Sequence, residues 1–368
     1  MINVNRRPKY LLIFTSSTFI LFLTLYFGIN NAVDQEIEYP KGFEVLLLPD
    51  KKQTNLPDIY YIILDEYAGT DSLEKNFGFD NIEFISALSK RGFFMPSNSY
   101  SNYPFTLLSI PSTLNMQYLN FFSEEMGIDS TNLQPIEVLR ENNLVIKNLK
   151  SQGYYVVSFY AGADSVPLLV DEKPCNSRSL LPGFDKRSEI LCTFSEIPKI
   201  KDRISQPVFV YAHMALPHDP YVFDEYGNPV SFNHENIDTT TERKFYLQQL
   251  KFTNKKTIET IDAIIAKSES LPIIILQSDH GERIGVNWDD PTKEMVRQGL
   301  NNLNAYYLPH DGRISLYDDI TPVNTFRVVF NEYLNADFEL LDDRHYWVSS
   351  DKKPYDLEDV TEIIDEYR

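Results

Sequence analysis

The sequence has little glycine, only two cysteines and no excess of basic charge, and each shortage argues against a class of protein. Only 14 of the 368 residues are glycine, which excludes collagen-like and low-complexity architectures. The 34 Lys and Arg residues face 53 Asp and Glu residues, so the formal net charge is −19. Without basic charge to replace phosphate counterions, no nucleic acid is expected as a partner. The hydrophobic content of 43% excludes general disorder.

An uncharged stretch near the N-terminus, residues 10–33, predicts a membrane anchor. At a rise of 1.5 Å per residue such a helix spans about 36 Å, more than the hydrocarbon core of a bilayer. Arg6, Arg7 and Lys9 precede the stretch, and basic residues on this side place the N-terminus in the cytoplasm. We therefore expect the following organisation: a cytoplasmic N-terminus at 1–9, a single-pass inner-membrane anchor at 10–31, a linker at 32–56 and an exported, periplasmic domain at 57–368.

A cleaved signal peptide is the alternative explanation of the uncharged stretch. Its apolar core would be shorter, and no Ala-x-Ala cleavage site follows here.

Cys175 and Cys192 can form a disulfide in an oxidising exterior, or they can remain two buried thiols.

Apolar runs typical of buried strands alternate with helical patterns over the rest of the chain. Fully apolar runs are typical of parallel strands that are buried on both faces. The expected strands are residues 59–64, 154–160, 207–212 and 272–276, and the expected helices are residues 80–91, 136–150, 243–267 and 323–334. This alternation predicts an α/β fold in which helices sandwich a mainly parallel sheet.

Acids and histidines follow these strands, at the edge where parallel sheets bind their ligands. They are Asp65 and Glu66 after the first strand, His213 and His218 after the third, and Asp279 and His280 after the fourth. Carboxylate and imidazole ligands suit Zn²⁺ or Mn²⁺, so we expect Asp65, Asp279 and His280 to hold one divalent ion. Each residue alone has a plainer explanation, because acids after strands often cap helices and single histidines are common in cores.

A candidate nucleophile, Thr106, lies at the start of a further expected helix. Backbone N–H groups and the helix dipole favour anions there, including a phosphoryl group. Coordination to a metal would lower the pKa of the threonine hydroxyl and make it an attacking group. The alternative is that Thr106 only caps the helix.

These motifs together resemble the alkaline phosphatase superfamily, in its sulfatase-like hydrolase and transferase branch. The resemblance rests on Asp65 after a strand, Thr106 in Thr-x-x-Ser-x-Pro, and the Asp279-His280-Gly-Glu segment. It extends over about residues 58–335. The segment around Thr106 is similar to the nucleophile segment of the phosphoethanolamine transferases that modify lipid A.

The resemblance implies a role for each candidate residue. Asp65, Thr106, Asp279 and His280 would be metal ligands, and Thr106 would attack phosphorus to form a phospho-threonine intermediate. The two histidines resemble the paired histidines of the transferases. This implies a catalytic role for His218 and a substrate-binding role for His213.

The chain departs from the family's patterns at three places. Neither Cys175 nor Cys192 lies in the [CS]-x-P-x-R motif of true sulfatases, which disfavours sulfate-ester hydrolysis. The transferases carry a further histidine where this chain has Asn287 and Thr292, so a second metal is doubtful. His310 is either a substitute for that histidine or an ordinary solvated loop residue. Glu66 remains an alternative to Asp65 as the ligand after the first strand.

We therefore expect a membrane-anchored, metal-dependent phosphotransferase or phosphodiesterase that acts on a glycan or lipid at the cell surface. The alternatives are a sulfatase or another ester hydrolase of the same fold, and a non-catalytic envelope protein that has kept the fold.

Overall fold

The computed structural model describes residues 39–49, 53–161, 169–175, 186–232, 237–310, 312–348, 350 and 352–366. The chain divides into two compact units, Met1–Phe43 and Glu44–Arg368. In the first unit only residues 39–43 are described, and the rings of Tyr39 and Phe43 stack there with centroids 4.6 Å apart. The anchor expected at 10–31 lies outside the described residues. Among the described helices, none combines the length and the hydropathy that a bilayer crossing needs.

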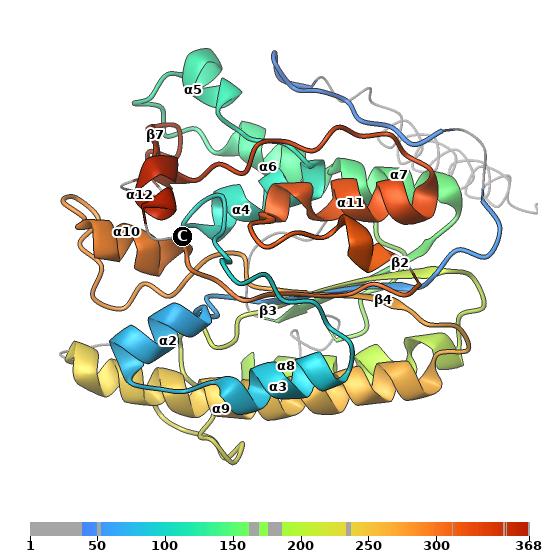
Figure 1. Ribbon diagram of the computed structural model, residues 1–368, viewed down its shortest axis with the longest axis horizontal. Helices are drawn as coiled ribbons and strands as arrows, with labels where there is room; N and C mark the ends of the chain where they lie inside the picture. Colours follow the sequence, from blue (N-terminus) through green and yellow to red (C-terminus); the bar gives the residue numbers. More distant parts are fainter. Residues whose placement is uncertain are drawn as a thin grey trace, which may run out of the picture. The chain divides into compact units, whose positions relative to one another are not determined.

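A five-stranded sheet forms the centre of the larger unit (Figure 1). In spatial order the strands are β2 (Tyr155–Ala161), β3 (Val208–Met214), β1 (Ile59–Leu64), β4 (Ile273–Gln277) and β5 (Asn304–Tyr307). The first four run parallel, and β5 pairs antiparallel with β4. Every residue of β1, β3 and β4 is buried, as continuous apolar runs predict.

Helices cover both faces of this sheet (Figure 1). One face carries α4 (Thr106–Asn115), α6 (Gln134–Glu141), α7 (Leu144–Gln152) and α11 (Pro322–Leu334). The other carries α2 (Thr70–Phe77), α3 (Ile82–Lys90), α8 (Lys186–Glu196) and α9 (Thr239–Lys267). The remaining α-helices and strands of the described residues are α5 (Phe121–Met126), α10 (Lys293–Leu300), β6 (Tyr346–Val348), β7 (Leu357–Asp359) and α12 (Thr361–Asp365). The α/β architecture with a mainly parallel sheet flanked by helices is thus confirmed.

Two expected elements differ in detail from the structure. The helix expected at 136–150 is two helices, α6 and α7, because the Asn143 side chain accepts a hydrogen bond from the Ile146 N–H at 3.0 Å and starts a new helix. Strand β3 continues to Met214, so His213 lies within the strand rather than after it.

Side-chain amides fix the segment that precedes β1 to the helical layer. The Gln117 amide bonds both the N–H and the C=O of Glu44, each at 3.0 Å. The Asn148 amide likewise bonds the Leu48 N–H at 2.7 Å and the Leu46 C=O at 2.8 Å. These paired bonds satisfy backbone groups that have no strand partner.

Cys175 and Cys192 form a disulfide. Cys192 belongs to α8, and Cys175 is fully buried in the core. The bridge, rather than two free thiols, is therefore what the structure contains.

Candidate active site

The sheet brings the predicted acids and histidines to one edge. Strand β1 lies between β3 and β4, and Leu64 is level with Met214 in the parallel register. The Asp65 N–H continues the ladder by donating to the Met214 carbonyl at 3.0 Å. The residues after β1 and β4 and the end of β3 therefore meet at the carboxyl edge.

Asp65, His213, Asp279 and His280 form a buried group, which we call the inner group. His213 Nε2 lies 3.5 Å from Asp65 Oδ2. His280 Nε2 lies 3.6 Å from Asp65 Oδ1 and 3.5 Å from Asp279 Oδ2. No member is more than 4% exposed, so these charges and dipoles act in a site from which water is largely excluded.

Thr106 joins the inner group from the first residue of α4. Its hydroxyl donates a hydrogen bond to Asp279 Oδ2 at 2.6 Å and lies 3.3 Å from His280 Nε2. Phe105 is the N-cap residue and supplies no side-chain cap, so the hydroxyl lies at a helix N-terminus whose first N–H groups no side chain caps. The structure thus brings together the four residues expected to bind the metal, and it adds His213 to them.

The Asp-His-Gly turn fixes the orientation of His280. Its Nδ1 lies 2.8 Å from the Gly281 carbonyl, which can only accept, so Nδ1 carries the proton and Nε2 presents its lone pair to the inner group. A Cβ at position 281 would lie 2.2 Å from the Gln298 carbonyl oxygen. Only glycine fits there, which explains the third residue of the motif.

The inner group has the composition and spacing of a metal site. Ligand atoms of Asp65, His213 and Asp279 all lie within 4.8 Å of one another. Asp65 Oδ1 is buried and accepts no hydrogen bond within the described part of the chain, which is costly unless a cation or another donor satisfies it. Two carboxylates with two imidazoles suit Zn²⁺ or Mn²⁺, so the residues present fit a divalent ion.

The electrostatics of the inner group favour positive charge. Burial raises the pKa of the Asp65 carboxyl, but the neighbouring imidazoles lower it by more, so it lies well below its usual range. Burial lowers the pKa of His213, but the bond to Asp65 and its negative charge raise it above the usual value. Both shifts have one physical cause, the attraction between carboxylate and imidazolium charges in a buried space.

Glu66, His218, Asp219 and Arg283 form a second cluster at the rim, which we call the outer group. Glu66 Oε1 accepts from the Arg283 backbone N–H at 2.9 Å and from its Nε at 3.3 Å. His218 Nδ1 donates to the Asp219 carbonyl at 2.6 Å, and Nε2 lies 3.1 Å from an Arg283 NH2 group. Arg283 was not predicted from the sequence as a residue of this edge. The one feature of the sequence that points to it is its position directly after Asp-His-Gly-Glu.

The side chains of the two alternative ligands considered from the sequence do not join the inner group. Glu66 has a positive φ of 61°, and its side chain turns to Arg283 and His218 rather than to Asp65. His310 is exposed in the turn after β5. None of its described contacts joins it to either group.

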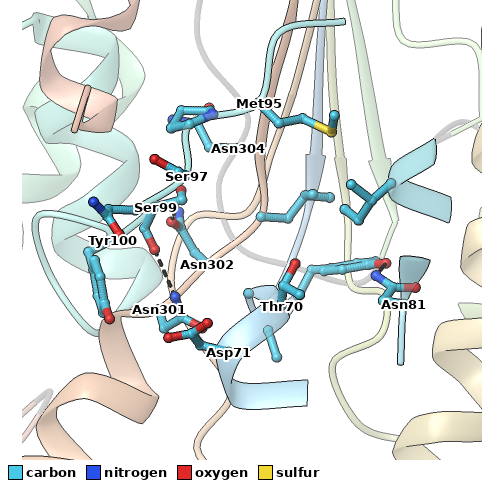
Figure 2. A pocket seen from close by; sticks show the side chains of 17 residues that line it. Thr70, Asp71, Asn81, Met95, Ser97, Ser99, Tyr100, Asn301, Asn302 and Asn304 are labelled. Carbon is cyan, nitrogen blue, oxygen red and sulfur yellow. Dashed lines mark hydrogen bonds between the residues drawn. The ribbon is translucent and has the colours of Figure 1, made fainter. Parts of the chain in front are cut away.

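Figure 2 shows a further cavity, of about 330 Å³, whose lining includes the side chains of Asn81, Asn301, Asn302 and Asn304. None of the residues expected in the site lines it. Asn301 donates to the Ser99 carbonyl at 3.0 Å, and Asn302 donates to the Ser278 carbonyl at 2.6 Å. Ser278 in turn bonds the His280 carbonyl at 2.7 Å. The Asn302 amide and the Ser278 hydroxyl therefore stabilise the loop that carries Asp279 and His280.

Fold and site together define an α/β protein with a candidate metal centre beside a threonine at a helix N-terminus. The family model named Sulfatase matches residues 57–327, most of the chain. The chain therefore belongs to the sulfatase family of the alkaline phosphatase superfamily, and it is an enzyme of phosphoryl or sulfuryl ester chemistry. This confirms the resemblance inferred from the motifs.

Solved structures share this fold at low sequence identity. The C-terminal periplasmic domain of EcEptC from Escherichia coli aligns with a TM-score of 0.57 and 13% identity, over 86% of this chain and 97% of that one. The corresponding domain of the phosphoethanolamine transferase EptC from Campylobacter jejuni gives 0.53 and 13%, over 78% and 92%. A sulfatase from Bacteroides thetaiotaomicron, from a locus for the metabolism of glycosaminoglycans, gives 0.52 and 14%, over 79% and 80%. No curated protein matches the chain significantly.

Proposed function

We propose that this protein is a metal-dependent phosphotransferase or phosphodiesterase that uses Thr106 as its nucleophile. The observation that carries the proposal is the position of the Thr106 hydroxyl, 2.6 Å from Asp279 Oδ2 and 3.3 Å from His280 Nε2. A threonine that only capped α4 would bond a backbone N–H of its own helix instead.

Asp65, Thr106, Asp279 and His280 would hold one divalent ion. Bound there, the ion supplies positive charge that lowers the pKa of the threonine hydroxyl and stabilises phosphoryl oxygens. A second crystal structure of the E. coli EcEptC domain is a complex with Zn, at 12% identity and a TM-score of 0.56, which favours Zn²⁺ over Mn²⁺. Because His213 is buried against Asp65, we place it with the metal ligands rather than with the substrate.

The residues at the carboxyl edge of the sheet then take different roles in the reaction. Asp279 Oδ2, which accepts the Thr106 hydrogen bond, orients the hydroxyl and takes its proton as Oγ1 attacks phosphorus. The P–Oγ1 bond forms while the bond from phosphorus to the leaving oxygen breaks. That oxygen departs on the open side of the site, where the partly exposed His218, as an imidazolium, donates a proton to it. A hydroxyl of an acceptor, or water, then attacks the phospho-threonine and restores Thr106.

We further propose that the enzyme acts outside the cytoplasm, held to the inner membrane by residues 10–31. The supporting facts are the uncharged N-terminal stretch, the disulfide and the periplasmic origin of the domains with which the chain shares its fold. A glycan or lipid of the cell surface is then the accessible substrate.

Turnover of an aryl phosphodiester and of an aryl sulfate by the full chain, loaded with Zn²⁺ in detergent, tests the proposal. We expect the phosphodiester to be the better substrate and Thr106→Ala to abolish its turnover while metal content stays unchanged. Thr70→Ala is the matched control, because Thr70 is also the first residue of a helix but is exposed.

Preference for the sulfate ester would identify a sulfatase of this fold. Absence of bound metal and of turnover would identify a non-catalytic envelope protein. Normal turnover by Thr106→Ala would contradict the assignment of Thr106 as the nucleophile.

A further inference from the structure

The guanidinium of Arg283 lies at the centre of the outer group. Its Nε and its backbone N–H both donate to Glu66 Oε1, at 3.3 Å and 2.9 Å, and one NH2 group lies 3.1 Å from His218 Nε2. His218 Nε2 also lies 3.5 Å from Glu66 Oε2, so both side chains border the guanidinium. Residues far apart in the sequence therefore hold the guanidinium in one orientation.

The same guanidinium packs against the residue that precedes the candidate nucleophile. Its central carbon lies 5.3 Å from the centroid of the Phe105 ring, which stacks on Trp288 with centroids 4.6 Å apart. A cation over an aromatic face is stabilised and held in place. Since Phe105 is the N-cap of α4, this contact fixes Arg283 beside the helix terminus that carries Thr106.

One end of the guanidinium remains available to a ligand. Arg283 has five N–H donors, of which Nε and one NH2 group are engaged as described. Its other terminal nitrogen donates to no acceptor among the residues that the structure describes. The side chain is 21% exposed and lines an open cavity of about 280 Å³ together with Glu66, Asp219 and Trp288.

The outer group could otherwise be taken for a second metal site. Ligand atoms of Glu66, His218 and Asp219 lie within 4.8 Å of one another. However, Glu66 Oε1 already accepts two hydrogen bonds from Arg283, and the same guanidinium lies 3.1 Å from His218 Nε2, so the cluster already holds a cation. A guanidinium carries its charge at every physiological pH and supplies here what a second ion would supply.

We propose that Arg283 is the second positive charge of this site, and that its free terminal nitrogen binds a non-bridging oxygen of the phosphoryl or sulfuryl group that Thr106 attacks. The inference rests on the proposed function and deepens it. On this proposal the enzyme uses one metal ion, and the N–H donors of the planar Arg283 guanidinium complete the site that binds the oxyanion.

Binding of inorganic phosphate to the Zn²⁺-loaded full chain, measured by isothermal titration calorimetry, tests the inference without turnover. Arg283→Met should weaken phosphate binding by at least about tenfold, the usual cost of a lost charge-assisted hydrogen bond. Arg283→Lys keeps the charge but loses the planar set of N–H donors, so its phosphate affinity should fall between those of the wild type and Arg283→Met. The matched control is Arg344→Met, which removes an exposed arginine at the edge of the small β6–β7 sheet and should change nothing.

Metal analysis of the same samples completes the test. We expect one Zn²⁺ per chain in the wild type and in both Arg283 variants, which also shows that the variants are folded. Equal phosphate affinity in the wild type and Arg283→Met would overturn the inference, and so would two Zn²⁺ per wild-type chain. Neither result would bear on the proposal that Thr106 is the nucleophile, which fails instead if Thr106→Ala turns over substrate at the normal rate.

Discussion

The inner and outer groups use the same kinds of residue at the same edge of the sheet, yet they differ in how their negative charge is balanced. In the inner group, Asp65 and Asp279 face two imidazoles, and one Asp65 oxygen has no hydrogen-bond partner in the described structure. In the outer group, Glu66 accepts two hydrogen bonds from Arg283, whose guanidinium also lies 3.1 Å from His218 Nε2. On the inference drawn above, Arg283 supplies in the outer group the positive charge that a bound ion would supply in the inner group.

The largest effect should come from removing charge from the inner group. Asp279→Asn keeps the shape of the side chain but removes a ligand charge and the acceptor of the Thr106 hydroxyl. We expect loss of bound Zn²⁺ and a fall in turnover of about a thousandfold or more, because metal-assisted charge stabilisation provides several kcal/mol.

Metal analysis and phosphodiester turnover measure this effect. Asp262→Asn is the control, since it removes an exposed carboxylate that pairs with Arg91 on the far helical layer. Retention of a full equivalent of Zn²⁺ by Asp279→Asn would show that the inner group is not the metal site.

A pair of histidine variants compares the two groups directly. His213→Gln should lose most of the bound Zn²⁺, because His213 is buried against Asp65 in the inner group. His218→Gln should keep the metal and lower kcat by about 10- to 100-fold, the usual cost of losing a residue that supports the reacting groups. If the two variants lose metal to the same extent, the division into two groups is wrong.

The disulfide should matter for stability far more than for either group's chemistry. It closes a loop of 17 residues and ties α8 to the core, so the double variant with both Cys175 and Cys192 changed to Ser should lose about 3 kcal/mol of unfolding free energy. Urea unfolding measures the loss, and metal content at 25 °C should not change. A double variant as stable as the wild type would contradict this expectation.

The smallest effect concerns the support of the outer group by α8. Lys186 donates to the carbonyls of His218 at 3.2 Å and Asp219 at 2.9 Å, and burial lowers the pKa of its amine to about 8. Between pH 8 and 10 the unfolded chain keeps a proton that the folded chain has lost, so folding is increasingly favoured as pH rises.

Comparison with Lys186→Met isolates this contribution, because the two chains share all other titrating groups. The unfolding free energy of the wild type minus that of the variant should increase from pH 8 to pH 10 in urea titrations. A constant difference over that range would mean that the Lys186 amine does not titrate early.

The sequence predicted the parts of this site that depend on local pattern. Strands β1, β3 and β4 are continuous apolar runs, so the residues after them could be placed at one edge. Strand β5 escaped prediction because it is short, begins with Asn304 and pairs antiparallel. Asn143 splits an expected helix: Asn is a preferred N-cap residue, but the helical apolar pattern of residues 136–150 continues across it.

Arg283 escaped prediction for a different reason. Its partners Glu66 and His218 lie 217 and 65 positions away along the chain, so no sequence spacing reports the contacts. The place of His213 against Asp65 likewise depends on the register of β1 with β3. The local sequence pattern identifies the candidate site residues, whereas the strand order and register of the sheet determine which of them come into contact.

The most direct test of the central claim is mass spectrometry of the enzyme quenched during steady turnover of an aryl phosphodiester. A phosphoryl adduct on the peptide that contains Thr106, absent from Thr106→Ala, is the result that the proposed mechanism predicts. An unmodified Thr106 peptide under conditions in which a covalent intermediate on another residue accumulates would contradict it.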